Sequence, residues 1–575
     1  MIRRIDTDVL ILGSGGAGLF AALHAQQANP ALSITVAVKG LLGKCGCTRM
    51  VQGGYNVALA PGDSIERHFM DTIEGGQWLP DQDLAWTLVT RAVERIRELE
   101  NELGCFFDRN PDGSVHQKAF AGQTFDRTVH KGDLTGIEII NRLAEQVWAR
   151  GIGRLEEHRA VELVRTPAGD AIAGVLMIDM RTGEFVFVRA RAVLLATGGG
   201  PTMYRYHTPS GDKSCDGLAM ALRAGLGLRD MEMVQFHPTG LLAGPDTRMT
   251  GTVLEEGLRG SGGWLLDGER NRFMEKYDHR LERATRDVVS RSIFREMRAG
   301  RTTPNGGVYI QMHHLGPDKV RRQFKGMVDR CADCGFDLAG GLVEVVPTAH
   351  YMMGGVVFRP DCTTHIEGLF AAGEDTGGVH GANRLGGNGV ANSTVFGGIA
   401  GESMAAWLAG QGGAREPDEE AIRASVAAHE APFSRKPGNL EAIREELYAC
   451  MWDDVGILRT AEGLRRGLAR LDALGDELAR CGVADGDRVF NLTWHDWINL
   501  ESLVSVSRAI AVAALAREDS RGAHFREDFP EASPPAQSDY TVVRSGAAGL
   551  ALAREPVRFT RVRPGESLLD EAPKA

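Results

Sequence analysis

Residues 7–18, TDVLILGSGGAG, determine the fold of the amino-terminal part of the chain. The first six residues are rich in Val, Ile and Leu and predict a buried strand, and the helix-forming stretch LFAALHAQQA follows the glycines at once. Gly13, Gly15 and Gly18 thus form a G-x-G-x-x-G motif between a strand and a helix, where bare backbone can approach a pyrophosphate. The sequence therefore predicts dinucleotide binding; the alternative is a helix that merely packs tightly on its strand.

Further strands along the chain predict one parallel sheet. A β-branched run at 34–38 follows about 20 residues after the glycines and completes a βαβ unit. Two more apolar strands that end in glycine, within 189–200 and 364–373, indicate that the sheet is interrupted and later resumed. The second strand ends at Lys39 rather than at the acidic residue that binds an adenosine ribose in NAD proteins, so spacing alone leaves the nucleotide open.

The composition is that of a globular protein. The 575 residues include 65 Lys and Arg against 76 Asp and Glu, a net charge of −11, and 43% are hydrophobic. This net negative charge does not predict a basic surface for the phosphate backbone, so we expect no nucleic-acid partner. Nine cysteines, with only Cys331 and Cys334 at C-x-x-C spacing, predict free thiols in a reducing cytoplasm, without a disulfide framework or a metal site. We identify no signal peptide and no uncharged apolar stretch of about 20 residues, and we expect membrane contact only through a partner.

Six stretches, the glycine loop among them, make the sequence recognisable. In chain order they are GSGGAGL at 13–19, QGG at 52–54, ATGGG at 196–200, LRDMEMVQFHPTG at 228–240, PTAHYMMGG at 347–355 and HGANRLGGNG at 380–389. Together they closely resemble the flavoprotein subunit of the succinate dehydrogenase and fumarate reductase family, to which L-aspartate oxidase also belongs. The resemblance covers nearly the whole chain and implies FAD rather than NAD.

The expected fold class is α/β, with a Rossmann-like FAD-binding domain in two parts. These parts are residues 1–235 and 352–412. Residues 236–351 correspond to the family's inserted α+β capping domain, 413–530 show helical patterning, and 531–575 alternate like a hairpin and resemble the family's C-terminal extension.

Hydride transfer to or from a carboxylate substrate needs cations that hold the carboxylates and a proton donor on the opposite face. The cations in the shared motifs are His237, His350, Arg286 and Arg384. By resemblance, His237, His350 and Arg384 anchor substrate carboxylates, and Arg286 is the proton donor or acceptor. Taken singly, each histidine could instead be a satisfied core residue.

An arginine with a pKa above 12 delivers protons only if it is quickly reprotonated, so Arg286 needs a relay. Glu256 and Arg259 match the family's relay, and their spacing aligns them if the segment is helical. The alternative for this pair is a surface ion pair.

The resemblance also assigns the FAD contacts. Glu374 is expected to accept hydrogen bonds from ribitol or ribose hydroxyls, and a helix beginning near Val390 to direct its positive end at the flavin. Phe120 and Gln123 resemble a loop that touches the substrate. The expected FAD-binding residues are Gly13, Ser14, Gly15, Gly16, Ala17, Gly18, Lys39, Thr48, Gln52, Gly53, Gly54, Ala196, Thr197, Gly198, Asp216, Glu374, Asn388 and Val390.

Four positions depart from the family pattern. Cys47 stands where succinate dehydrogenases carry the histidine that bonds covalently to FAD, so we expect noncovalent FAD, with a cysteinyl link as the alternative. Glu255 replaces the usual threonine that holds a substrate carboxylate. Two like charges at about 4 Å cost roughly 4 kcal/mol unless Glu255 is protonated, paired, or meets a cationic or hydroxylated group. Gly387 and Gly389 replace two serines.

The sequence thus predicts an FAD-dependent oxidoreductase that moves a hydride between flavin N5 and a carboxylate substrate across a CH–CH bond. Fumarate or succinate is the default substrate. The alternatives are an amino-dicarboxylate oxidase of the L-aspartate oxidase type and a non-catalytic flavosubunit that relays electrons. We expect the partner to be an iron-sulfur electron-transfer subunit, and the location to be cytoplasmic, peripheral at the inner face of the membrane.

Overall fold

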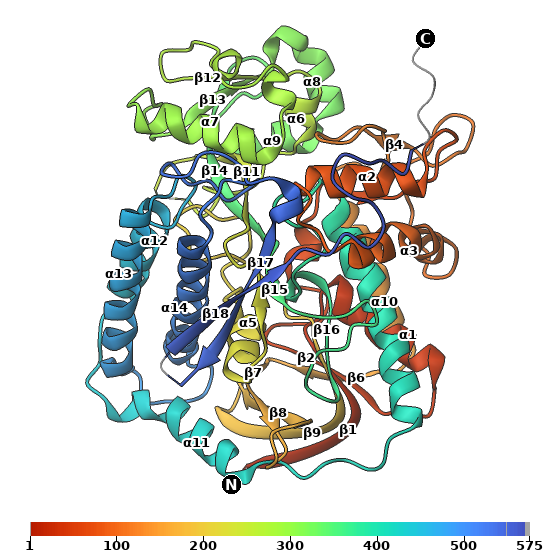
Figure 1. Cartoon of the computed structure of the whole chain (residues 1–575), viewed down its shortest axis with the longest axis vertical. Coiled ribbons are helices and arrows are strands. Elements are labelled where there is room, and N and C mark those ends of the chain that lie inside the picture. The colour runs from red at the N-terminus through yellow and green to blue at the C-terminus, as the bar shows by residue number, and fades with distance from the viewer. Residues whose placement is uncertain (1, 246, 548, 570–575) are drawn as a thin grey trace.

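The computed structural model describes residues 2–245, 247–547 and 549–569. Figure 1 shows three bodies: a sheet with its covering helices, a helical domain beside it, and a cap above both. We call the first body, residues 1–235 and 352–412, the dinucleotide domain; residues 236–351 form the cap, and residues 413–530 the helical domain. The long hairpin of the C-terminal part runs between the first two bodies.

The sheet of the dinucleotide domain is mixed, in the order β6-β2-β1-β9-β8-β7, with β16 also paired to β9. Its parallel strands are β1 (Arg3–Leu12), β2 (Ile34–Val38), β6 (Gly153–Glu156), β9 (Glu184–Leu195) and β16 (Leu369–Ala371). The antiparallel strands are β7 (His158–Arg165) and β8 (Ile172–Asp179). The late return of β16 to β9 confirms that the sheet is interrupted and resumed.

Two glycine-rich helices lie against each other on this sheet. Helix α1 (Gly16–Ala28) follows β1 directly, and α10 (Asn388–Ala409) begins two residues before the predicted Val390. A Cβ at Gly397 of α10 would lie 2.5 Å from the carbonyl oxygen of Ala17, and one at Gly401 would overlap that of Ala21. The start of α1 therefore packs against the middle of α10, about ten residues after α10 begins.

Smaller elements complete the dinucleotide domain. They are α2 (Ile65–Gly75), α3 (Gln82–Asn101), α4 (Thr135–Ala149), α5 (Asp216–Arg223) and the sheet of β3 (Tyr55–Asn56), β5 (Thr128–Val129) and β4 (Gln117–Lys118).

The cap has its own sheet and its own hydrophobic core. The strand order is β11 (Val234–Leu241), β14 (Leu342–Met352), β13 (Val308–Gln311) and β12 (Trp264–Leu266). Its helices are α6 (Gly257–Gly260), α7 (Arg286–Arg298), α8 (Pro317–Gln323) and α9 (Lys325–Asp333). Because β11 and β14, the first and last strands, pair with each other, the chain leaves and re-enters the dinucleotide domain at one place.

The helical domain leads into a hairpin that joins the dinucleotide domain. Its helices are α11 (Glu419–Glu430), α12 (Leu440–Asp453), α13 (Ala461–Arg480) and α14 (Leu492–Ala516). The predicted hairpin is β17 (Asp539–Gly546) and β18 (Gly549–Pro556), and it forms a sheet with β10 (Leu228–Arg229) and β15 (Gly355–Val356). Helix α14 contains Asp496, Glu501 and Arg508, so it is not an uncharged stretch, but by length and overall composition it could cross a membrane. Of its most apolar part, 67% is buried within the protein.

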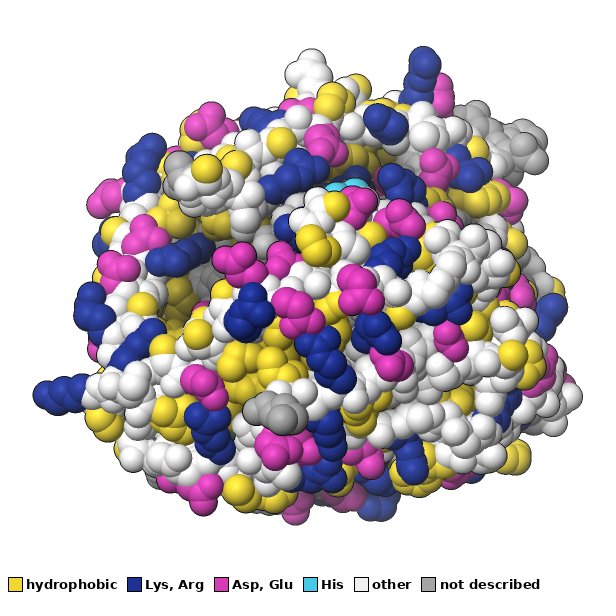
Figure 2. All heavy atoms as spheres, turned by 90° about the horizontal axis from the view of Figure 1, so that it is seen from below, with side chains coloured by type: hydrophobic (Ala, Val, Ile, Leu, Met, Phe, Trp, Pro, Cys, Tyr) yellow, Lys and Arg dark blue, Asp and Glu magenta, His cyan; other side chains and the backbone are white. Residues whose placement is uncertain are grey.

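The surface carries charges of both signs. On the face shown in Figure 2, acidic and basic side chains are interspersed. All nine cysteines are free thiols, including Cys331 and Cys334 in the cap.

Candidate functional site

One cavity of about 500 Å³ joins the glycine loop after β1 to the arginines of the cap. Most of the residues predicted from sequence line it, and Gly18, Gln123, Arg259 and Asn388 stand outside its lining. The predicted residues in the lining are Gly13, Ser14, Gly15, Gly16, Ala17, Lys39, Thr48, Gln52, Gly53, Gly54, Phe120, Ala196, Thr197, Gly198, Asp216, His237, Glu255, Glu256, Arg286, His350, Glu374, Arg384 and Val390.

The glycine loop is a cradle that side chains would fill. Gly13 has φ +110°, and a Cβ there would overlap the carbonyl oxygen of Ala196. A Cβ at Gly18 would overlap the carbonyl oxygen of Gly13. The backbone N–H of Gly16, at the start of α1, donates to Thr48 Oγ1 at 3.0 Å. Bare backbone at a helix start is the geometry that accepts a pyrophosphate.

Two cations contact Asp216, the first residue of α5: Lys39, which directly follows β2, and Arg159 of β7. Lys39 Nζ lies 2.8 Å from Oδ2 of Asp216, and Arg159 Nη2 lies 2.7 Å from Oδ1. Burial alone would raise the pKa of Asp216, but Arg159 and Lys39 hold it below its ordinary value. Arg159 also lines the cavity and was missed from sequence, because nothing in its strand marks it as part of the site.

Glu374 offers a carboxylate oxygen to the cavity. Its Oε1 accepts from the backbone N–H groups of Met352 at 3.0 Å and Gly200 at 3.4 Å. Burial raises its pKa to about 7. The neighbouring Asp375, also missed from sequence, accepts from Thr197 Oγ1 at 2.9 Å and fixes the turn after β9. The cradle and this acceptor fit a dinucleotide with ribose or ribitol hydroxyls.

Asn388 and Gln123 form hydrogen bonds with other residues of the protein and do not line the cavity. Asn388 Oδ1 accepts from Asn56 Nδ2 at 2.9 Å and contacts His68 Nε2 at 3.0 Å. Gln123 Nε2 donates to the carbonyl oxygen of Gly386 at 2.9 Å. Both therefore hold the loop before α10.

Arg286, Glu256 and Arg259 form one continuous chain of contacts. Arg286, the first residue of α7, binds Glu256 Oε2 through Nε at 3.0 Å and Nη2 at 2.6 Å. Arg259 Nη2 lies 3.3 Å from the other oxygen, Oε1. Glu256 stands directly before the single turn of α6, with helical backbone angles, so the segment is helical as the predicted alignment requires. Burial alone would raise the pKa of Glu256, but the two arginines hold it below its ordinary value, and the carboxylate is ionised.

Gln235 links two arginines of the site and was missed from sequence. Its Oε1 accepts from Arg286 Nη1 at 3.0 Å, and its Nε2 donates to the carbonyl oxygen of Arg384 at 2.7 Å. Gln235 stands two residues before His237 on β11, so both side chains emerge on the same face of that strand. This alternation is the signal that could have identified it.

His237 and His350 face each other with ring centroids 5.5 Å apart. Burial, and then the positive charge of Arg286, lower the pKa of both rings far below the usual range. Both rings are therefore neutral at pH 7, and our expectation that they are cations is wrong. A neutral imidazole still offers one N–H donor to a carboxylate.

Arg384 carries a guanidinium that, within the described residues, has no hydrogen bond or ion pair. It stacks on the ring of Tyr351, with 4.3 Å between the guanidinium carbon and the ring centroid. Burial and the nearby Arg286 lower its pKa to about 10, so it remains charged at pH 7. A buried guanidinium of this kind is ready to bind a carboxylate through two parallel hydrogen bonds.

Glu255 is paired. Lys118 of β4 places its Nζ 2.5 Å from Oε1 of Glu255, across the boundary between the dinucleotide domain and the cap. Burial raises the pKa of Glu255, and Lys118 opposes that rise. Lys118 Nζ also lies 5.7 Å from the ring centroid of Phe120. The sequence left open whether Glu255 is protonated, paired or facing a cationic or hydroxylated group. In the structure it is paired, with Lys118.

Comparison with known proteins decides the family. A model described as "FAD binding domain" matches residues 8–390, and one described as "Fumarate reductase flavoprotein C-term" matches 444–568. A fumarate reductase (CoM/CoB) subunit of Methanothermobacter marburgensis is 40% identical over 92% of this chain and 95% of its own length. The chain belongs to the succinate dehydrogenase and fumarate reductase flavoprotein family.

Two further members of this family show how far the likeness extends. The fumarate reductase flavoprotein subunit of Escherichia coli is 36% identical over 92% of this chain and 89% of its own length. A solved structure of E. coli quinol fumarate reductase superposes with a TM-score of 0.91 at 34% identity, covering 98% of this chain and 99% of that one. The chain is therefore an FAD-dependent oxidoreductase that acts on CH–CH groups, with the predicted α/β fold.

The structure explains the two glycines that replace family serines. Gly387 has φ +89°, and a Cβ there would overlap Oδ1 of Asn56. A Cβ at Gly389 would lie 2.8 Å from Nη1 of Arg384. Both glycines therefore make room, one for the loop before α10 and the other for the free guanidinium.

Cys47, at the family's position for a covalent histidine, lines the cavity as a thiol. Burial, together with the nearby carboxylate of Glu374, raises its pKa to about 12. A protonated thiol is a weak nucleophile. Among residues 2–245, 247–547 and 549–569, no group of three His, Cys, Asp or Glu side chains is arranged to hold a metal ion.

Proposed function

We propose that the chain interconverts an unsaturated and a saturated dicarboxylate, with fumarate and succinate as the default pair. The observation that carries this proposal is the chain Arg286–Glu256–Arg259, which ends in the same cavity as the free guanidinium of Arg384. Since Lys118 neutralises Glu255, the paired carboxylate no longer repels a substrate carboxylate.

Each side chain has a distinct task in this proposal. Arg384 binds one substrate carboxylate, and the neutral rings of His237 and His350 donate hydrogen bonds to the substrate. Arg286 delivers or removes the proton at the substrate carbon, and it is reprotonated through Glu256. When bound, FAD supplies the hydride chemistry.

The cavity also indicates how FAD is held. We propose that the glycine loop and the start of α1 take the pyrophosphate, and that Glu374 accepts from hydroxyls of the sugar or ribitol. The protonated thiol of Cys47 supports noncovalent binding. The remaining contacts are those predicted from sequence that line the cavity, from Lys39 to Val390.

The test is anaerobic. The purified flavoprotein is reduced chemically, fumarate is added, and the return of oxidised flavin absorbance is followed. We expect rapid return in the wild type. The variant Arg286→Lys should keep its FAD but lose nearly all turnover, because a lysine ammonium cannot reproduce the bidentate contact with Glu256. No return with fumarate would reject the proposed substrate, and undiminished turnover of Arg286→Lys would reject the role of this arginine.

A second candidate is an amino-dicarboxylate oxidase, in which Glu255 would receive a substrate ammonium. Glu255 lines the cavity, which favours this candidate, but Lys118 already occupies one of its oxygens. Rapid reaction of the L-aspartate-reduced flavin with oxygen, and no reaction with fumarate, would support it over the first. A non-catalytic relay protein would show neither reaction.

We also propose that the partner is an iron-sulfur electron-transfer subunit, and that the chain lies in the cytoplasm at the inner face of the membrane. Met50 and Leu134 line the cavity and are 46% and 52% exposed, which gives the cavity an apolar rim at the surface. Exposed apolar side chains grouped at a redox cavity are typical of a docking surface. Co-purification of a tagged chain, compared with a Met50→Lys/Leu134→Lys variant, tests this surface: a partner lost from the variant supports it.

A further inference from the structure

The two arginines proposed to act on the substrate belong to different parts of the molecule. Arg286 begins α7 in the cap, whereas Arg384 lies in the loop 378–387 of the dinucleotide domain. Their spacing therefore depends on how the cap sits on that domain. Gln235 ties them together from inside the site.

A second tie comes from outside the site, from the loop 520–527 that follows α14 in the helical domain. Arg291, further along α7, donates from Nη1 to the carbonyl oxygen of Gly522 at 2.6 Å. The next residue, Ala523, donates its backbone N–H to the carbonyl oxygen of Ala382 at 2.8 Å. One short segment thus contacts both the helix that carries Arg286 and the loop that carries the second arginine.

The loop fits closely against both neighbours. Gly522 has φ +51°, and a Cβ there would overlap the carbonyl oxygen of Ala382. The guanidinium carbon of Arg291 lies 5.2 Å from the ring centroid of Phe525, and the Arg291 side chain is 17% exposed. Arg291 is thus largely buried, where a charge-assisted hydrogen bond is worth more than at the surface, and the same Nη1 also lies 3.3 Å from Oδ2 of Asp287 within α7.

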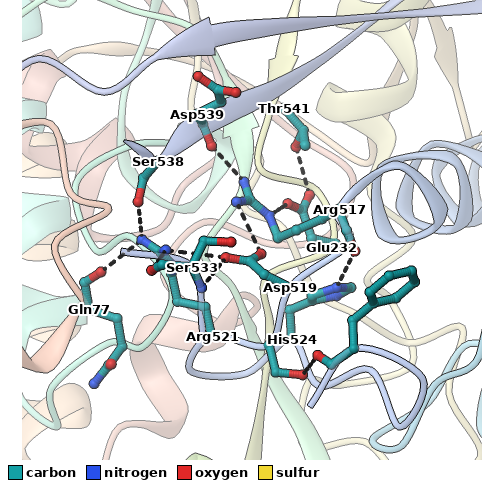
Figure 3. Close-up of polar contacts among 12 residues, drawn as sticks. Gln77, Glu232, Arg517, Asp519, Arg521, His524, Ser533, Ser538, Asp539 and Thr541 are labelled. Atoms are coloured by element: carbon teal, nitrogen blue, oxygen red, sulfur yellow. Dashed lines mark hydrogen bonds and ion pairs between the residues drawn. The ribbon is translucent and has the colours of Figure 1, made fainter. Parts of the chain in front are cut away.

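The loop makes several hydrogen bonds on its far side, as Figure 3 shows. Arg521 donates to the carbonyl oxygen of Ser533 at 2.8 Å and to Asp519 Oδ2 at 3.2 Å. Its backbone N–H donates to the carbonyl oxygen of His524 at 2.7 Å. His524 is fully buried, and its Nε2 lies 3.2 Å from the carbonyl oxygen of Arg517. Hydrogen bonds of Arg521 and His524, on either side of Gly522, therefore support the segment that contacts α7.

We infer that Arg291 is a positioning residue: through Gly522 it holds Arg286 at the distance from Arg384 that catalysis requires. The helical domain, which supplies no residue to the cavity wall near these arginines, then sets how closely the cap approaches. This inference rests on the proposed roles of Arg286 and Arg384.

The test compares Arg291→Ala and Arg291→Lys in the FAD-loaded protein, with Arg298→Ala as the matched control. Arg298 lies on the same helix and pairs with Glu527 of the same loop at 2.7 Å, but both side chains are exposed, and such pairs contribute little. We expect Arg291→Ala to lower kcat with fumarate by about tenfold to a hundredfold, because small misplacements of a catalytic group cost this much. Arg291→Lys should recover part of the rate, since an ammonium can also donate to the carbonyl of Gly522. The control should stay within about twofold of wild type.

Amide hydrogen exchange gives a second readout that does not depend on turnover. Peptides covering 378–390 and the start of α7 should exchange faster in Arg291→Ala, at unchanged FAD content, and at the wild-type rate in Arg298→Ala. Unchanged exchange and kcat in Arg291→Ala, or equal losses in both variants, would overturn the inference.

Two further outcomes remain decisive. If the wild type does not turn over fumarate, the proposed function fails, but the exchange result still decides whether Arg291 holds the loop. If Arg291→Ala does not fold, Gly522→Ala replaces it, because its new Cβ displaces Ala382 directly; wild-type exchange over 378–390 in that variant would overturn the inference.

Discussion

At the scale of the residue, Lys118 changes the net charge that position 255 presents to the cavity. From sequence alone, Glu255 is expected to repel a dicarboxylate, because its partner Lys118 lies 137 residues away on another domain and cannot be recognised. The structure joins the two at 2.5 Å and leaves Glu255 neutralised at the cavity wall. In the proposed function, this pair keeps the site open to a dicarboxylate.

Removal of Lys118 should expose the repulsion that it now cancels. We expect Lys118→Ala to raise KM for fumarate about tenfold or more at pH 7, because an unpaired Glu255 faces the substrate. The pKa of Glu255, already raised by burial, should rise further without Lys118, so KM should recover as the pH is lowered. Steady-state KM measured across pH 5 to 8 checks this. The double variant Lys118→Ala/Glu255→Gln should restore KM, and a KM that stays high there would contradict the electrostatic explanation.

The raised pKa of Glu374 should make the folded protein less stable as the pH rises. Its folded-state pKa of about 7 exceeds the ordinary 4.5, so between these values the folded protein keeps a proton that the unfolded chain has released. The free energy of unfolding should therefore fall by about 3 kcal/mol as pH rises through this window, at 1.36 kcal/mol per unit. Chemical unfolding of flavin-free protein at several pH values measures this slope. Glu374→Gln should flatten it in part, because Asp375, with a pKa raised to about 6, contributes a similar fall; a slope identical to wild type would contradict the assignment.

At the scale of the element, α1 and α10 form one unit of the cofactor site. Their backbones approach at Gly397 and Gly401, where any side chain would collide with α1. The starts of both helices line the cavity, at Gly16 and Val390. Their spacing therefore sets the width of the cavity.

A methyl group added where α10 contacts α1 should push the two helices apart and widen the cavity. We expect Gly401→Ala to lower the free energy of unfolding by about 1 to 3 kcal/mol and to reduce FAD retention, because overpacking pushes α10 away from Ala21. Thermal unfolding and flavin content per chain measure the two effects. Gly412→Ala, which meets nothing within 4 Å, is the matched control. Full flavin content in Gly401→Ala would show that the helices can separate without cost.

The elements that sequence predicts well are those with a local signal. The run from β1 through the glycines to α1 carries an apolar strand followed by turn chemistry, and in the hairpin β18 alternates between more and less exposed side chains. The pairing of β17 with β10 depends on residues more than three hundred positions apart, and no local pattern records it. In the site, the motif residues were predicted from the resemblance to the family. Gln235 lies in one of these motifs and was overlooked, whereas Arg159 and Lys118 were missed because each acts through a partner that only the fold brings close.

At the scale of the whole molecule, the C-terminal hairpin binds the helical domain to the dinucleotide domain. Arg517, at the end of α14, donates to Glu232 at 2.5 Å and to the carbonyl oxygen of Asp539 at 2.9 Å. Thr541 of β17 donates its hydroxyl to Glu232 at 2.8 Å. Residues 228–240 carry the site residues of β11. Their Glu232, just before β11, is thus bound by β17 from the C-terminal part of the chain.

Loss of one buried donor in this network should be measurable. We expect Thr541→Val to lower the free energy of unfolding by about 1 to 3 kcal/mol, because Glu232 loses a hydrogen bond in a site that water does not reach. Urea unfolding followed by tryptophan fluorescence measures it. Thr560→Val, at an exposed contact with Asp83, is the control and should change stability by less than about 0.5 kcal/mol. A loss no larger than that of the control would show that Arg517 alone satisfies Glu232.

The continuous cavity has a consequence for how the protein matures. One space joins the glycine loop to Arg286 and Arg384, so a dinucleotide held by that loop would form one wall of the space beside these arginines. In the proposed function, a newly made chain would then load its flavin first and select its acid second.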